Sequence, residues 1–144
     1  MAKATYRDVN LILRLYEIRR EGKLRQARNW FAANFKAKSM EEFWQLCPAG
    51  SETNAFFRQC ASYWDMAGSF VNAGVLNEDL FFTNSRELLL VWLRVKPVLA
   101  EARAAFQDPK YMSNLEIAGN AFAEWLSRTS GPAAYYSFAK RVSG

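Results

Sequence analysis

The chain has 144 residues, a formal charge of +5, no histidine and two cysteines, and just over half of it (51%) is apolar. This length suits one domain, and the apolar fraction is enough for a packed core, which argues against disorder. The absence of histidine excludes Ser-His-Asp triads, Cys-His pairs, HExxH zinc sites and histidine-ligated haem. We therefore expect one folded domain that is not an enzyme and that holds no metal or cofactor.

The first quarter of the chain is basic and is predicted to be helical. Residues 1–38 contain ten Lys or Arg and three Asp or Glu, which gives a charge of +7, whereas the rest of the chain carries −2. A first helix is predicted over about 8–21, with Asp8 capping the free N–H groups of its first turn, and a second over about 23–36. We interpret residues 8–37 as a basic helical hairpin.

The predicted first helix is apolar on two faces. One face comprises Val9, Ile12, Leu13 and Tyr16, and the other comprises Leu11, Leu15 and Ile18. Such a helix is either central in its own domain or shared with another subunit. A short amphipathic helix predicted at about 132–142 carries aromatic residues that would pack on this subunit or on another. These features predict a homo-oligomer.

Caps and helix breakers divide the rest of the chain into further helices. Ser39 and Glu42 form a capping box that opens a short helix. The remaining helices are predicted over about 54–73, 88–95, 97–106 and 110–128, with a short piece beginning at Asn77. No stretch alternates as a half-buried strand would. The predicted fold class is all-α: a single-domain irregular helical bundle of about seven to nine helices spanning residues 1–144.

A narrow polar stripe runs along the otherwise apolar helix predicted over 54–73. Its members are Arg58, Ser62, Asp65, Ser69 and Asn72, at offsets of 0, 4, 7, 11 and 14 residues, which is one helix face. Arg58 and Asp65 are separated by about 10 Å of helix axis and cannot easily pair with each other. Each therefore needs a partner elsewhere: Arg86 or a base of the hairpin for Asp65, and Glu17, Glu42 or Glu87 for Arg58.

The stripe has three interpretations. The preferred one is a polar network that fixes helix register, because a buried charge needs a partner whether or not it has a chemical role. A solvated face is the second. The third is a binding site for a small apolar or amphipathic molecule in a helix-lined pocket, whose polar residues would be Arg58, Tyr63, Asp65 and Asn72.

Four arginines of the basic quarter are candidates for anion binding. They are Arg19, Arg20, Arg25 and Arg28. A basic patch attracts nucleic acid, anionic lipid or an acidic partner. This run is interrupted by Glu21 and has no recognition-helix context, which makes it a weak indication of nucleic-acid binding. A solvated helix surface with local ion pairs is the preferred interpretation.

Two features bear on the compartment. Cys47 and Cys60 form at most one pair, which is no disulfide framework, and reduced thiols are typical of a cytosolic protein. The longest apolar run, residues 88–93, has six residues, whereas a bilayer span needs about 20. We therefore expect a soluble, cytoplasmic protein without a membrane span.

Several segments together resemble a known family. They are residues 15–21, 25–31, 54–58, 63–67 and 71–74, of which Tyr63-Trp64-Asp65-Met66-Ala67 belongs to the most specific part. They resemble the DUF4760-type families of small bacterial helical proteins over roughly residues 10–115. The resemblance implies a bacterial, cytoplasmic, all-α protein with no assigned activity, and it supplies no catalytic residue.

The sequence thus leads to three hypotheses about function. The first is a non-enzymatic interaction module that self-associates through its two-faced first helix. The second is a binder of a small apolar or amphipathic ligand in a helix-lined pocket. The third is a nucleic-acid or anionic-surface binder that uses the basic N-terminal helices.

Overall fold

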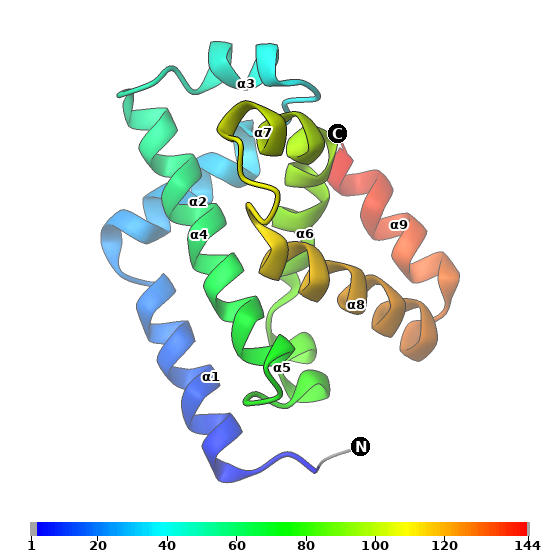
Figure 1. The fold of residues 1–144 in the computed structure, drawn as a ribbon. Helices are drawn as coiled ribbons and strands as arrows, with labels where there is room; N and C mark the ends of the chain where they lie inside the picture. Colours follow the sequence, from blue (N-terminus) through cyan, green and yellow to red (C-terminus); the bar gives the residue numbers. More distant parts are fainter. Residues whose placement is uncertain (1–2, 144) are drawn as a thin grey trace.

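The computed structural model describes residues 3–143, which fold almost entirely into α-helices (Figure 1). In chain order these are α1 (Tyr6–Arg19), α2 (Gly22–Asn34), α3 (Met40–Leu46), α4 (Glu52–Asn72), α5 (Glu78–Asn84), α6 (Arg86–Val95), α7 (Leu99–Phe106), α8 (Ser113–Ser130) and α9 (Pro132–Ser143), with a 3-10 turn, η1 (Lys96–Val98), before α7. This part of the chain contains no strand, so the predicted all-α fold class is confirmed. None of the described helices is long and apolar enough to cross a membrane.

The longest helix, α4, brings the other elements together. It packs against α2 and α8, and α6 packs against α8, α9 and α4. In Figure 1, α1 lies to the left of α4 and α2 crosses behind it, whereas α8 and α9 lie to the right. The buried apolar side chains form one continuous cluster, which includes Trp64, Phe31, Phe82 and Phe122. This single core defines one domain.

The N-terminal cap of α1 differs from the predicted one. Thr5 is the N-cap, and Asp8 Oδ2 accepts a hydrogen bond from the Thr5 backbone N–H at 2.7 Å. The other carboxylate oxygen, Oδ1, accepts from the backbone N–H of Asn77 at 2.8 Å. The prediction that Asp8 caps the helix is therefore wrong: its carboxylate completes a capping box and ties the start of α1 to the start of α5.

The first two helices form a bent pair rather than a packed hairpin. Glu21 lies between them and caps α2 by accepting hydrogen bonds from the backbone N–H groups of Lys23 and Leu24. The two helices make few contacts beyond this turn, and α2 packs mainly against α4. The outer side of α1 is therefore left without a neighbour in this chain.

A buried arginine holds the far end of α2. The Arg94 guanidinium donates hydrogen bonds to the carbonyls of Ala32 and Phe35, at 3.1 and 2.9 Å, and to the Val142 carbonyl of α9 at 2.6 Å. These carbonyls lie at helix C-termini, where the helix dipole is negative. They compensate the buried charge without a carboxylate.

In the C-terminal part of the chain, the start of α8 differs from the predicted one, whereas α9 lies close to its predicted range. The helix predicted over 110–128 is Ser113–Ser130, because Met112 has the left-handed φ of 57° and no helix passes through it. The tail helix α9 lies close to its predicted range, and its Phe138 and Val142 are buried. The tail therefore packs on its own chain.

Candidate functional site

One end of the polar stripe on α4 is covered by α8. Asp65 Oδ1 accepts a hydrogen bond from the backbone N–H of Leu115 at 2.8 Å, and Asp65 Oδ2 accepts one from Asn114 Nδ2 at 3.4 Å. Asn72 Nδ2 donates to the Asn114 carbonyl at 3.0 Å. The N-cap of α8, Met112, has no side-chain oxygen. Asp65 therefore supplies, from another helix, the cap that α8 lacks.

Close packing keeps this end of the stripe shut. A Cβ added to Gly68 would lie 3.0 Å from the Cβ of Ala118 and 3.2 Å from the Asn114 carbonyl oxygen. At such a separation the helix backbones leave no room for a ligand between them. The Asp65–Asn72 end of the stripe is thus a hydrogen-bonded contact between α4 and the first turn of α8.

The four residues proposed for a polar pocket are not brought together. Tyr63 points into the core, where its hydroxyl donates a hydrogen bond to the Leu15 carbonyl at 2.6 Å. Asp65 is partly buried beside α8, and Asn72 is exposed but hydrogen-bonded to α8. Arg58 lies exposed nearer the start of α4. Of the four, Arg58 alone lines the cleft described below.

The ion pairs expected for the stripe are replaced by others. Glu87 pairs with Arg28, with 2.7 Å between Oε2 and Nε. Arg86 lies over an aromatic ring of α9. Within residues 3–143, neither Arg58 nor Asp65 belongs to an ion pair. The charge of Arg58 is therefore uncompensated by a carboxylate contact.

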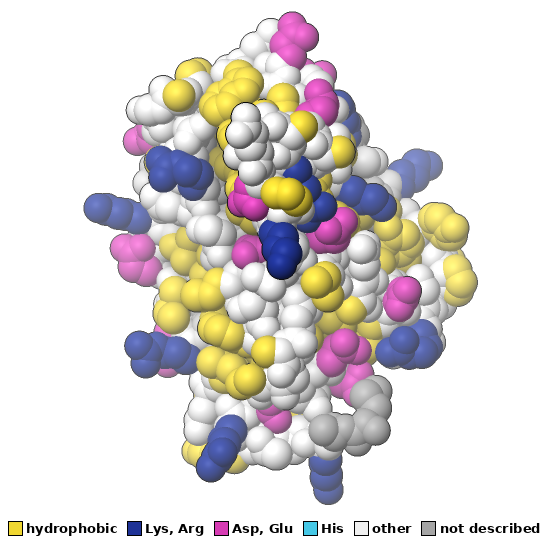
Figure 2. Space-filling view, viewed as in Figure 1, with side chains coloured by type: hydrophobic (Ala, Val, Ile, Leu, Met, Phe, Trp, Pro, Cys, Tyr) yellow, Lys and Arg dark blue, Asp and Glu magenta, His cyan; other side chains and the backbone are white. Residues whose placement is uncertain are grey.

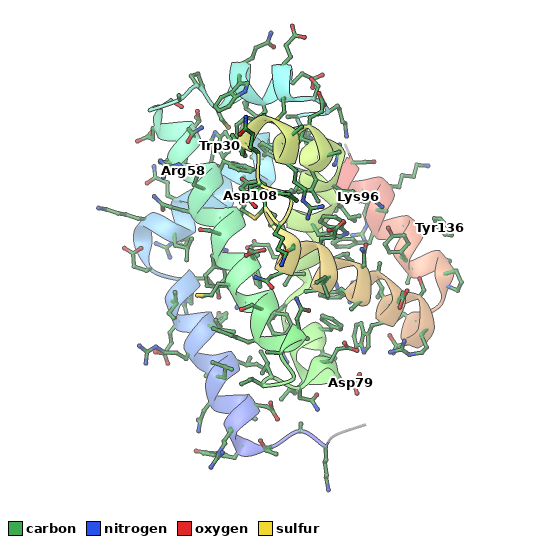
Figure 3. The ribbon with its side chains drawn as sticks, viewed as in Figure 1. Trp30, Arg58, Asp79, Lys96, Asp108 and Tyr136 are labelled. Carbon is green, nitrogen blue, oxygen red and sulfur yellow. The ribbon has the colours of Figure 1, made fainter. Side chains whose placement is uncertain are left out.

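Arg58 is oriented by its neighbour Asn54. Arg58 Nε donates to Asn54 Oδ1 at 2.9 Å, and Asn54 Nδ2 donates to the Cys47 carbonyl at 3.0 Å. The second bond decides which atom of the amide faces the guanidinium, because only the nitrogen can donate. With Nε engaged, the two Nη groups are left to bind an anion. Figure 3 shows Arg58 on the half of α4 nearer α3.

An apolar cleft with a volume of about 620 Å³ lies beside Arg58. Its walls come from α3 and the turn after it, from α4, and from the segment that joins α7 to α8. The apolar lining includes Phe43, Trp44, Phe57, Phe106, Tyr111 and Met112. Among the described residues that line it, Arg58 alone is charged. The cleft therefore combines a wide apolar surface with a single cation.

The rim of the cleft exposes large aromatic side chains. Trp44 is 41% exposed and Phe106 is 40% exposed, and their rings meet edge-on with centroids 6.2 Å apart. Phe106 also contacts Tyr111 edge-on at 5.2 Å. Figure 2 shows hydrophobic side chains on the surface at the end of the molecule that carries α3 and α7. Exposed rings on a concave surface are typical of binding sites.

The floor of the cleft is not tightly backed. A void of about 10 Å³ lies behind it and shares four wall residues with it: Phe43, Phe57, Phe106 and Tyr111. The other walls of this void are apolar side chains of α3, η1 and its neighbours. A void of this size holds about one water-sized probe, so the floor rings have only slight room to move.

One edge of the cleft has a strained backbone. Gln107 and Met112 have φ values of 53° and 57°, a left-handed region that costs non-glycine residues about 1–2 kcal/mol each. They bracket the segment between α7 and α8. Arg103 holds this segment in place by donating to the Tyr111 carbonyl at 3.0 Å and to Glu116 at 2.9 Å. Strain of this kind concentrates at functional sites.

Tyr111 supplies a hydroxyl at the same edge. Burial raises the pKa of this phenol, and the nearby carboxylates of Asp65 and Asp108 raise it further. Figure 3 labels Asp108 in the segment between α7 and α8. Tyr111 therefore remains protonated at neutral pH.

The four candidate anion-binding arginines do not form one cationic patch. Arg28 pairs with Glu87, and buried Arg19 donates to the Asn84 carbonyl at 3.4 Å. Arg20 and Arg25 are exposed. Arg20 also lies over the ring of Tyr16, so three of the four contact groups within the chain.

The cysteines have no features of a reactive site. Cys47 and Cys60 are unpaired and buried. Burial raises the pKa of the Cys47 thiol to about 11, and it raises the pKa of the Cys60 thiol as well. Both thiols therefore stay protonated at neutral pH. In the described part of the chain, no three His, Cys, Asp or Glu side chains are grouped to hold a metal ion.

The fold and the site define an all-helical protein with an aromatic cleft at one end. The chain belongs to the family described as a domain of unknown function (DUF4760), whose model matches residues 4–122. No curated protein and no solved structure matches the chain. The family match confirms the resemblance seen in the sequence and includes every residue that lines the cleft, whereas α9 lies beyond it.

Proposed function

We propose that this protein is a non-enzymatic binding module that holds a small amphipathic molecule in the aromatic cleft. The apolar body of the ligand would lie against Trp44, Phe106 and Tyr111, and a carboxylate would meet the Nη groups of Arg58. The observation that carries this proposal is an arginine without an ion pair, oriented by Asn54, on an apolar cleft.

The shape of the cleft supports a ligand of one to three rings. A volume of about 620 Å³ lies within the range of small-molecule sites, roughly 300–1,000 Å³. Edge-on and stacked contacts with aromatic walls favour a flat ligand. A planar carboxylate fits the two parallel Nη donors of a guanidinium. Together these features favour an aromatic carboxylic acid.

A pair of matched probes tests the proposal. 2-Naphthylacetate and its neutral amide differ only in the anionic group, and binding is followed by NMR through the indole N–H signal of Trp44. We expect a dissociation constant of about 0.1–1 mM for the acid, since it has few atoms, and at least severalfold weaker binding of the amide.

Variants of Arg58 and Arg25 test whether Arg58 causes the difference in affinity between the acid and the amide. Arg58→Gln is expected to weaken binding of the acid about five- to tenfold and to leave the amide unchanged, because one charge-assisted contact is lost. Arg25→Gln is the control, since Arg25 is exposed and is not among the residues that line the cleft. Equal affinities for acid and amide in the original chain, or no change at Trp44, would contradict the proposal.

A second candidate function is an interaction made by α1. Four large side chains on the outer face of this helix are exposed: Tyr6 at 78%, Val9 at 41%, Leu13 at 52% and Tyr16 at 44%. The ring of Tyr16 also contacts the guanidinium groups of Arg19 and Arg20. An exposed apolar stripe of this kind favours a protein contact. The homo-oligomer expected from the sequence is proposed on the same ground.

The remaining predictions have less support. Binding of nucleic acid or an anionic surface would have to rely on Arg20 and Arg25, because Arg19 and Arg28 are engaged within the chain. A cytoplasmic location is proposed because both cysteines are unpaired.

A further inference from the structure

The exposed residues of α1 follow the spacing of a coiled-coil seam. Tyr6, Val9, Leu13 and Tyr16 lie at offsets of 0, 3, 7 and 10 residues, which are alternate a and d positions of a heptad. The opposite side of α1 faces the core through Leu15, which is 2% exposed. The helix thus has one inward face and one outward seam, and the four side chains of the seam are exposed.

We infer that this seam docks on the same seam of a second copy, with the two α1 helices antiparallel. The inference rests on the proposed self-association and adds its partner and geometry. In antiparallel pairs, a residues face d residues of the other helix. One register overlaps all four side chains of each copy: Tyr6 faces Tyr16 of the second copy, and Val9 faces Leu13.

The residues beside the seam suit this arrangement. The two-fold axis passes near position 11, so Asn10 of one copy lies beside Asn10 of the other, and amides pair well with themselves. Glu17 lies near the start of the second copy's α1, where Lys3 and the helix dipole are positive. A parallel pair would instead place Glu17 beside Ile12 of the second copy, where Glu17 has no cation to pair with. The charges therefore favour the antiparallel second copy.

The size of the contact sets the strength to expect. One helix of 14 residues per copy buries in total on the order of 1,000 Å², which is at the low end of specific interfaces. We expect a dimer that is populated at a protein concentration of about 0.1–1 mM and that dissociates on dilution.

Sedimentation equilibrium tests the dimer. The unaltered chain is expected to dimerise, and Leu13→Glu is expected to be monomeric and folded, since Leu13 is 52% exposed. Ile117→Glu, at an exposed apolar position of α8, is the control and should still dimerise. A chain that stays monomeric at 1 mM would overturn both the self-association and this inference. Binding of such a monomeric chain to anionic lipid vesicles in a co-sedimentation assay would give α1 a different partner and would overturn both in the same way.

Cross-linking with bis-maleimidoethane tests the direction. Asn10→Cys and Glu17→Cys occupy equivalent flanking positions one heptad apart, and the native cysteines are buried. Antiparallel pairing offsets the two copies of residue 10 by about 3 Å along the axis and those of residue 17 by about 18 Å. Only Asn10→Cys should cross-link. Equal cross-linking of both variants, or of neither in a proven dimer, would overturn the antiparallel geometry while leaving self-association standing.

Discussion

The two ends of the polar stripe on α4 share one helix face but have opposite surroundings. At one end, Asp65 and Asn72 are hydrogen-bonded to the first turn of α8. At the other, Arg58 borders an open aromatic cleft and has no carboxylate partner. The difference teaches that a polar residue on an apolar helix is structural where another helix end covers it, and free for a ligand where only side chains surround it.

The largest effect is expected where α4 and α8 touch most closely. Gly68→Val would push its side chain against the Asn114 carbonyl and Ala118, neither of which can move without shifting α8. Overpacking of this kind should lower the free energy of unfolding by about 2–3 kcal/mol. Urea denaturation measures it, and Gly22→Val, where no atom lies within 4 Å of the added Cβ, is the control. A loss shared equally by both variants would contradict the close packing.

The cap supplied by Asp65 should have the next largest effect. Asp65→Ala removes the acceptor for the Leu115 N–H and should lower the free energy of unfolding by about 1–2 kcal/mol. Asp65→Asn keeps an acceptor oxygen and should lose less. Thermal unfolding followed by circular dichroism measures both variants. An Asp65→Ala variant as stable as the unaltered chain would contradict the structural role assigned to the Asp65–Asn72 end of the stripe.

Asp8 extends the comparison to a second carboxylate that accepts hydrogen bonds from backbone N–H groups. Asp8 joins the start of α1 to the start of α5. Hydrogen bonds from the backbone N–H groups of Thr5 and Asn77 hold the pKa of Asp8 below its usual value. This group therefore contributes stability at pH values above about 4, its unfolded pKa, and the contribution is lost as the pH falls through the lower folded pKa. Asp8→Asn should be less stable at pH 7 and should lose less stability on acidification.

Stability measured at pH 7 and pH 3 checks this dependence. Glu124→Gln, at an exposed position on α8, serves as the control and should follow the unaltered chain. If the Asp8→Asn variant lost as much stability on acidification as the unaltered chain, Asp8 would not be the group that titrates.

The smallest effect on stability is expected at the open end. Arg58 is exposed and its one hydrogen bond, to Asn54, is replaceable by water. Arg58→Gln should therefore change the free energy of unfolding by less than about 0.5 kcal/mol. A destabilisation as large as that of Asp65→Ala would mean that Arg58 has a structural role.

Local patterns were enough to predict most helices and the membership of the stripe. Breakers such as Pro48 and Pro132 and the cap Ser39 act within a few residues, and a period of 3.6 residues places Arg58 and Asp65 on one face. What covers each residue depends on contacts distant in sequence: Asp65 bonds to Leu115. The cap of α1 was misassigned for a different reason, because the Thr5–Asp8 capping box is a local pattern that the sequence reasoning missed. Only the second partner of Asp8, Asn77, is distant in sequence.

The cleft itself could not be predicted from helical periodicity. Trp44, Phe106 and Tyr111 have the helical spacing that core residues also have, so periodicity does not distinguish them from the core. They lie near helix ends, where the chain turns away and leaves one side of the ring exposed. The neighbouring breakers, Pro48–Ser51 and Asp108-Pro109, were the one indication that these rings would border a surface.

The methionines of this chain provide the most direct test of the account. With ¹³C-labelled methyl groups, Met112 reports on the cleft and Met40 reports on the void behind it. Met66 is exposed and lies on α4 next to Asp65, outside the cleft lining, so it serves as the control. Addition of 2-naphthylacetate is predicted to shift the Met112 methyl signal most, Met40 less and Met66 not at all. A shift at Met66 without one at Met112, or no shift at either up to several times the expected dissociation constant of about 1 mM, would contradict the assignment of the cleft as the binding site.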